Sequence, residues 1–143
     1  MKNTMLEMTR YAALARQAVA EGVVLLKNEA VLPLAPGGRA ALFGYAQFHY
    51  YKSGTGSGGL VNVTHVPNLP EILGGDGGYR LDAEVQARYA AWLADHPYEM
   101  GTGWAQEPWF QPEMPLDEEF VRAAAQRADT AFIVIGRTAG EDQ

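Results

Sequence analysis

The sequence lacks cysteine altogether and has few positive charges. With no cysteine among its 143 residues, the chain can form neither a disulfide nor a thiolate metal site. It carries 17 acidic against 11 basic residues, a formal net charge of −6, and no basic cluster. Nucleic-acid-binding surfaces concentrate positive charge, so we expect no nucleic-acid partner. The absence of cysteine suits a reducing compartment, and we expect a cytoplasmic location.

Long apolar runs and several common catalytic signatures are also missing. No stretch approaches the roughly 20 apolar residues of a membrane-spanning helix, and charges from Lys2 to Glu21 interrupt any signal-peptide core. The three histidines, His49, His65 and His96, have no metal-ligand spacing. No serine lies in a G-x-S-x-G turn. We therefore expect no membrane association, no zinc site, no serine-hydrolase triad and no cofactor.

The residues that are present indicate a globular domain with several helices. Hydrophobic residues make up 48% of the chain and charged residues 20%, which are ordinary values for such a domain. Apolar residues recur at helical spacing over residues 9–26, 81–94 and 117–127. Thr9 is a candidate N-cap for the first of these helices, and a short helix is expected at residues 70–73.

Two short apolar runs predict buried strands. Residues 40–44 and 132–136 each end in glycine and are typical of parallel strands, and the alternating residues 60–66 are expected to be extended. Strands separated by helical segments favour an α/β domain with a mostly parallel sheet flanked by helices. Two clear strands are few for a sheet, which indicates an incomplete one.

A glycine-rich loop over residues 52–59 follows the first predicted strand. Gly54, Gly56 and Gly59 match the dinucleotide fingerprint G-x-G-x-x-G, but the strand ends ten residues before the first of them and the next segment is predicted to be extended. Two other interpretations stay open, a plain flexible loop and a backbone cradle for a polar ligand. Tyr51 and the aromatics before it suit a sugar ring, or alternatively cover the core.

A single carboxylate, Glu141, follows the second predicted strand, with Arg137 and Gly140 beside it. In α/β proteins the loops at the carboxyl ends of strands commonly carry active-site groups. A carboxyl group that acts on sugars normally needs a second one facing it. Most glutamates in such loops are only solvated, so the position by itself leaves both interpretations open.

Four segments together resemble the α/β-sandwich domain of family 3 glycoside hydrolases. Residues 21–34 resemble its opening, 40–44 its first strand, 52–59 its glycine-serine loop, and 129–142 the strand and loop that carry its acid/base glutamate. The form of residues 50–59 is similar to that of bacterial β-glucosidases in which the sandwich precedes the catalytic barrel.

The resemblance implies a retaining β-glucosidase-like parent enzyme that removes terminal β-linked glucose. In this family an aspartate on a (β/α)₈ barrel is the nucleophile, and the acid/base role would fall on Glu141. The substrate contacts that the resemblance implies come from the glycine loop and from beside the glutamate, at Tyr51, Lys52, Ser53, Gly56, Ser57 and Arg137.

We therefore expect residues 1–143 to be the N-terminal portion of the sandwich domain, without the barrel. The implied partners are a small carbohydrate substrate and that barrel, and the chain alone should be inactive. Missing strands would leave apolar surface exposed, which favours marginal stability or association into homo-oligomers. The alternative is a non-catalytic carbohydrate-binding or interaction module.

Overall fold

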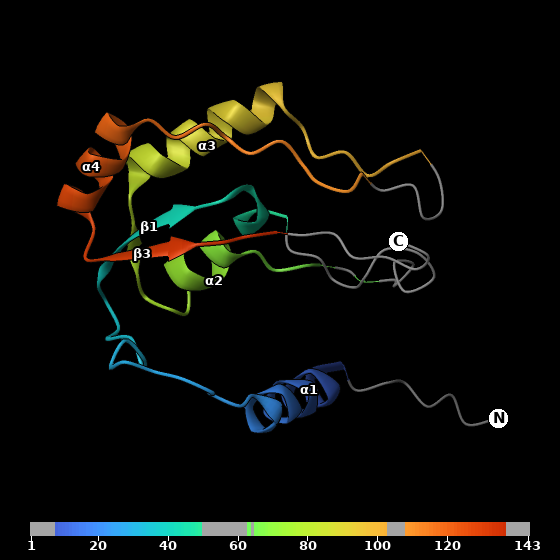
Figure 1. The fold of residues 1–143 in the computed structure, drawn as a ribbon. Coiled ribbons are helices and arrows are strands. Elements are labelled where there is room, and N and C mark those ends of the chain that lie inside the picture. The colour runs from blue at the N-terminus through green and yellow to red at the C-terminus, as the bar shows by residue number, and fades with distance from the viewer. Residues whose placement is uncertain (1–7, 50–62, 64, 103–107, 137–143) are drawn as a thin grey trace. The chain divides into compact units, whose positions relative to one another are not determined.

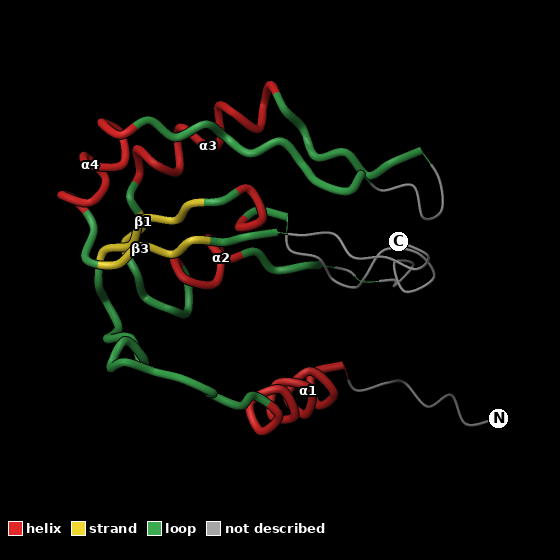
Figure 2. Tube along the Cα trace, in the orientation of Figure 1, coloured by secondary structure: helices red, strands yellow, loops and turns green. Residues whose placement is uncertain are grey.

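Two units make up the chain. The computed structural model describes residues 8–49, 63, 65–102 and 108–136. The units are Met1–Leu34 and Ala35–Gln143. The described part of the first contains one helix, and that of the second contains a sheet with helices (Figure 1; Figure 2).

The first unit contains α1 (Met8–Gly22), all of whose residues are exposed. Its sequence favours a helix because five of its 15 residues are alanine. The helix ends at glycine, before the expected end at residue 26, and Thr9 lies inside it rather than at its N-cap. Glycine and the two β-branched valines that follow it have low helix propensity. Among the described helices, none combines the length and apolar character needed to cross a membrane.

A three-stranded parallel sheet forms the centre of the second unit. β1 (Arg39–Phe43) lies in the middle, with β2 (Arg80–Leu81) on one side and β3 (Thr130–Ile133) on the other. Ala40 of β1 pairs with the last residue of β2 and with the first residue of β3. The predicted α/β class with parallel strands is confirmed, and the described residues contain one strand more than the sequence indicated.

Helices lie on both sides of this sheet. Figure 1 shows α3 (Ala83–Asp95) and α4 (Glu118–Arg127) on one side and α2 (Leu69–Gly74) on the other. Four consecutive residues of β1, from Ala40 to Phe43, are buried. A strand buried on both faces explains why this segment is a continuous apolar run.

The core lies between β1 and the helices α3 and α4. Its buried side chains are Ala41, Phe43, Val85, Tyr89, Met114, Phe120 and Ala124. Phe43 and Phe120 meet edge to face, with ring centroids 6.4 Å apart. Arg88 of α3 lies over the Phe120 ring at 4.1 Å and pairs with Asp117 at 2.7 Å. Burial of each large apolar side chain contributes about 2 kcal/mol, and the arginine contacts connect the two helices.

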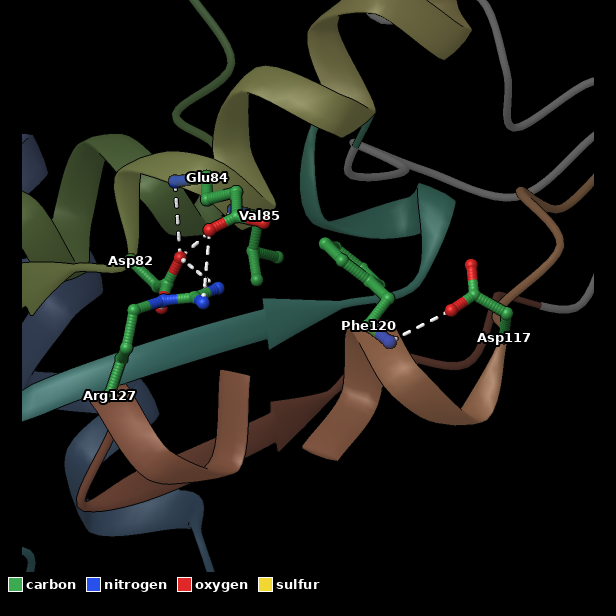
Figure 3. A network of polar contacts seen from close by, with 6 residues as sticks. All are labelled: Asp82, Glu84, Val85, Asp117, Phe120 and Arg127. Carbon is green, nitrogen blue, oxygen red and sulfur yellow. Dashed lines mark hydrogen bonds and ion pairs between the residues drawn. The ribbon is translucent and has the colours of Figure 1, made fainter. Parts of the chain in front are cut away.

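Aspartates begin α3 and α4. Asp117 accepts a hydrogen bond from the backbone N–H of Phe120 at 2.8 Å, and Asp82 accepts one from Val85 at 3.0 Å (Figure 3). Each cap satisfies a backbone donor that has no partner inside the helix, which is worth about 1 kcal/mol. The acidic helix start predicted at residue 117 is confirmed.

The sequence predicted a helix over residues 81–94, and the position of β2 corrects this prediction. The helix begins two residues later, because Arg80 and Leu81 form a strand and Asp82 is the cap. The N–H of Arg80 donates to the carbonyl of Gly38, and that of Asp82 to the carbonyl of Ala40. Leu81 fits the apolar spacing of a helix and of a strand equally well, so periodicity could not separate the two.

Arg127, at the end of α4, binds the start of α3. Its Nε lies 2.7 Å from Asp82 Oδ2 and its Nη1 lies 2.9 Å from Glu84 Oε2 (Figure 3). The Asp82 side chain is only 3% exposed. Burial raises the pKa of this carboxyl, but the hydrogen bonds from Arg127 and from backbone N–H groups outweigh burial and leave the pKa below its ordinary value.

A second aspartate joins the beginnings of β1 and β3. Asp129 accepts from the backbone N–H of Arg39 at 3.0 Å and from two nitrogens of its guanidinium at 3.2 and 2.7 Å. The N–H of Asp129 in turn donates to the Arg39 carbonyl. The side-chain bond from Arg39 is the main cause that lowers the pKa of Asp129 to about 2.

The ends of β1 and β3 approach each other too closely for a side chain. The N–H of Val134 donates to the Phe43 carbonyl at 2.8 Å. Gly44 has a φ of 102°, and a Cβ built on it would lie 2.0 Å from the Val134 carbonyl oxygen. A glycine is therefore required where β1 ends, for its backbone conformation and for the space.

One apolar face of β3 is exposed. Ala131 and Ile133 pair with Ala41 and Phe43, so they face the side of the sheet that carries α3 and α4. Those helices lie over β1 and leave Ile133 74% exposed and Ile135 80% exposed. The expected exposure of apolar surface is thus present at this strand.

Replacement of Gly44 by alanine should destabilise the second unit by more than about 2 kcal/mol, because it adds both backbone strain and a collision with the Val134 carbonyl. Gly37→Ala is the matched control, since Gly37 also has a positive φ, 81°, but has open space at the Cβ position. Chemical denaturation followed by circular dichroism measures both. Equal losses for the two variants would contradict the close approach.

Acid should weaken the ion pair between Arg39 and Asp129. The folded pKa of Asp129 lies below the ordinary value of 3.8, at about 2, so its contribution is full above the unfolded pKa and is lost as the pH falls through the folded one. Asp129→Asn should flatten the fall in unfolding free energy between these two values. Asp76→Asn, at an exposed turn, is the control, and an unchanged acid limb in Asp129→Asn would contradict the expectation.

Candidate functional site

The carboxyl ends of β1 and β3 lie side by side and define the candidate site. Phe43 and Ile133, the last residues of the two strands, are register partners. In an open α/β sheet, ligands bind outside the carboxyl ends of the strands. The described residues that leave this edge are 44–49 after β1 and 134–136 after β3.

The turn after β1 is a short 3₁₀ helix, Tyr45–Gln47, that is held by buried side chains. The Gln47 side chain is fully buried, and its amide nitrogen donates to the carbonyls of Leu42 at 3.1 Å and Gly44 at 3.0 Å. Its amide oxygen accepts from Gln86 of α3 at 3.1 Å. A buried amide with these partners fixes the direction of the turn.

A tyrosine and a glutamate bind the donors of the same turn. The hydroxyl of Tyr89, on α3, accepts from the N–H of Gly44 at 2.6 Å. Glu113 accepts from the N–H of Tyr45 at 2.8 Å and from its neighbour Met114 at 3.0 Å. Glu113 is therefore a carboxylate at the candidate edge, stabilised by backbone donors.

Three rings stack beside the turn. The centroids of Tyr45 and His49 lie 5.4 Å apart, and those of His49 and Tyr98 lie 4.7 Å apart, with interplanar angles of 19° in both pairs. Desolvation lowers the pKa of His49, although the residue as a whole is exposed. The imidazole is therefore neutral near pH 7, where it can accept as well as donate a hydrogen bond.

A small cavity opens between the turn and the segment before α4. Tyr45 and His49 line one side and Phe110, Gln111 and Glu113 the other. Its volume of about 40 Å³ holds a few waters, whereas ligand pockets usually have at least ~300 Å³. The cavity is therefore too small to enclose a small-molecule ligand.

Residues 97–102 and 108–112 are two chain segments that the side chain of Gln111 connects. The side-chain oxygen of Gln111 accepts from the Glu99 N–H at 3.1 Å and its nitrogen donates to the Glu99 carbonyl at 2.8 Å. Trp109 and Phe110, in the second of these segments, are 56% and 74% exposed. Exposed aromatics beside a site are typical of surfaces that contact a ligand or a partner.

The opposite edge of the sheet has a wider hollow of about 390 Å³. Arg39, Arg80, Asp82 and Arg127 are among the residues that line it. Its arginines 39 and 127 already pair with Asp129 and Asp82, so their charges are balanced. In the ranges that the structure describes, no group of three or more metal-ligating side chains comes together.

The site residues predicted from the sequence lie outside the described residues. They are Glu141, Arg137, Tyr51, Lys52, Ser53, Gly56 and Ser57. The structure describes the two strand ends that precede them in the chain, and these are adjacent. Sequence reasoning missed Tyr89 and Glu113, because a bond from a side chain to a distant backbone N–H leaves no periodic signal.

Known proteins of similar sequence are β-glucosidases, although no model of a protein family matches. A β-glucosidase of Ruminococcus albus is 48% identical over 138 residues, and the match covers 96% of this chain and 14% of the relative. β-Glucosidase A of Butyrivibrio fibrisolvens is 39% identical over 137 residues, covering 92% of this chain and 15% of the relative.

Solved structures give the same result. The crystal structure of a β-glucosidase from Paenibacillus barengoltzii superposes with a TM-score of 0.84 at 45% identity, covering 96% of this chain and 15% of that one. β-Glucosidase 3B from Thermotoga neapolitana, in complex with glucose, gives 0.79 at 31% identity, covering 96% and 19%. The chain thus spans about one-seventh of the curated relatives. The resemblance to family 3 glycoside hydrolases is confirmed, and these 143 residues are a β-glucosidase-like segment with an open parallel α/β sheet.

Proposed function

We propose that this chain is the part of a retaining β-glucosidase that supplies the general acid/base, Glu141. The observation that carries the proposal is the adjacency of β1 and β3, whose carboxyl ends are register partners. The segments after these two strands contain the glycine-rich loop and Glu141. Chain segments that leave two adjacent parallel strands emerge at the same edge of the sheet, and the similarity to β-glucosidases adds support.

Hydrolysis with retention needs two carboxyl groups about 5 Å apart. In the first step an aspartate of a barrel domain, outside this chain, attacks the anomeric carbon while protonated Glu141 gives its proton to the departing glycosidic oxygen. In the second step the Glu141 carboxylate removes a proton from water, which displaces the aspartate. The glutamate ends protonated again, so the cycle closes.

The glycine-rich loop and Arg137 would contact the substrate on the side of the leaving group. The proposed contacts are the hydroxyls of Tyr51, Ser53 and Ser57, the amine of Lys52 and the backbone of Gly56. Hydroxyl, amine and main-chain groups match the hydrogen-bonding needs of a sugar. Glucose in the Thermotoga neapolitana structure supports terminal β-linked glucose as the group that is removed.

Glu141→Gln in the complete enzyme tests the acid/base role. Phenyl β-glucoside needs a proton on its leaving oxygen and dinitrophenyl β-glucoside does not. We expect kcat/KM for the phenyl glucoside to fall by about 10²–10⁴-fold and that for the dinitrophenyl glucoside to fall far less. The variant should also lose the alkaline limb of its pH–rate profile.

Asp142→Asn is the matched control, because it removes the same charge from the neighbouring residue. It should leave the ratio between the two substrates unchanged. Equal, small losses with both substrates in Glu141→Gln would remove the proposed role. So would a larger effect of Asp142→Asn on that ratio.

The 143-residue chain alone should release no glucose from either substrate. Without the nucleophile and the barrel, it lacks the positioning and charge stabilisation that carry most of the rate. Glucose release by the purified chain, followed with a coupled assay, checks this, and Glu141→Gln serves as the control for contaminating enzyme. Turnover that disappears in this variant would show that the chain is a sufficient catalyst.

A further inference from the structure

The first two backbone donors after β1 are bound by side chains from distant parts of the chain. The Gly44 N–H donates to the hydroxyl of Tyr89, 45 residues later, and the Tyr45 N–H donates to Glu113, 68 residues later. The two distances, 2.6 and 2.8 Å, are those of strong hydrogen bonds. The end of β1 is therefore defined by side chains and not by strand pairing alone.

Tyr89 and Glu113 also contact each other. The Tyr89 hydroxyl lies 3.4 Å from Glu113 Oε1, the oxygen that accepts from Met114. Tyr89 is fully buried, and burial is the main cause that raises its pKa to about 12. The phenol is thus protonated at neutral pH, so it accepts from Gly44 and can donate to Glu113.

The contacts of Glu113 connect it to the turn. The residue is exposed, and its printed partners among the described residues are neutral donors, the N–H groups of Tyr45 and Met114 and the hydroxyl of Tyr89. A carboxylate with water available that still accepts from these donors satisfies the turn by hydrogen bonding and not by an ion pair. Gln47 and Gln86 hold the carbonyl side of the same turn, so its donors and acceptors are both satisfied by side chains.

The turn lies against the exit of β3 as well. The Cβ position of Gly44 meets the Val134 carbonyl, and the small cavity beside the turn has Glu113 and Gly136 in its wall. A displacement of Gly44 therefore acts on both chain segments that leave the edge. These segments lead to the glycine-rich loop and to Glu141.

We propose that Tyr89 and Glu113 are positioning residues that fix, through Gly44 and Tyr45, the directions in which the chain leaves β1 and β3. This inference rests on the proposed acid/base role of Glu141. A carboxylic acid must lie within hydrogen-bond reach of the leaving oxygen, and a shift of 1 Å costs up to about 10²-fold in rate. In this role Tyr89 and Glu113 position the carboxylic acid of Glu141 and do not themselves contact the substrate.

The test is the substrate ratio of the complete enzyme with Tyr89→Phe and with Glu113→Gln. Tyr89→Phe keeps the buried ring and leaves the Gly44 N–H without its acceptor, and Glu113→Gln replaces one acceptor oxygen with a donor. We expect kcat/KM for phenyl β-glucoside to fall about tenfold more than for dinitrophenyl β-glucoside, with little change in KM. A general loss of folded enzyme would lower both rates equally.

Tyr79→Phe is the matched control. Tyr79 is also buried, and its hydroxyl donates to the Ala35 carbonyl at 3.0 Å, away from the end of β1. It should leave the substrate ratio unchanged. An unchanged ratio in folded Tyr89→Phe and Glu113→Gln would overturn the proposal, and so would an equal change in Tyr79→Phe.

Two further outcomes are decisive. If Glu141→Gln changes the ratio and both positioning variants do not, the acid/base role stands and the positioning role falls. If Glu141→Gln itself does not change the ratio, both fall. Circular dichroism establishes which variants fold. If only Tyr89→Phe fails to fold, Glu113→Gln decides, and if neither folds the pair serves the fold alone and the proposal is rejected.

Discussion

The pairing of β1 with β3 is the interaction on which the rest of the second unit depends. At the amino end the two strands are joined by Arg39 and Asp129, and at the carboxyl end by the bond from Val134 to Phe43. The approach that this bond requires leaves no room for a Cβ at residue 44. The register of the sheet thus determines the conformation of the turn from which the candidate site is built.

α3 connects the two edges of the sheet. Its first turn is capped by Asp82 and bound by Arg127 near the amino ends of the strands. Two turns further along, Tyr89 reaches the carboxyl end of β1. At about 1.5 Å of rise per residue, seven residues span about 10 Å, whereas a five-residue strand spans about 16 Å. The long side chain of Tyr89 covers the remaining distance, so one helix contacts both ends of the strand.

Part of this arrangement could be predicted from the sequence. The strand at residues 40–44 and the helix after Asp117 have strong local signals, a continuous apolar run and an acidic cap. β2 was missed because two residues are too short for periodicity and Leu81 also fits a helix. Tyr89 and Glu113 have no local signal: their function depends on backbone donors 45 and 68 residues away.

The separation between β1 and β3 has a consequence for the order of folding. Asp129 and Arg39 lie 90 residues apart in the chain. During synthesis β1 therefore cannot pair with β3 until all the residues between them have been made. Contacts of this range form late, because the loop-closure entropy is lost before they form. β2, about 40 residues after β1, can pair first. The edge that carries the candidate site is consequently completed last, once Val134 has left the ribosome, and until then the carboxyl end of a buried strand is open to other partners.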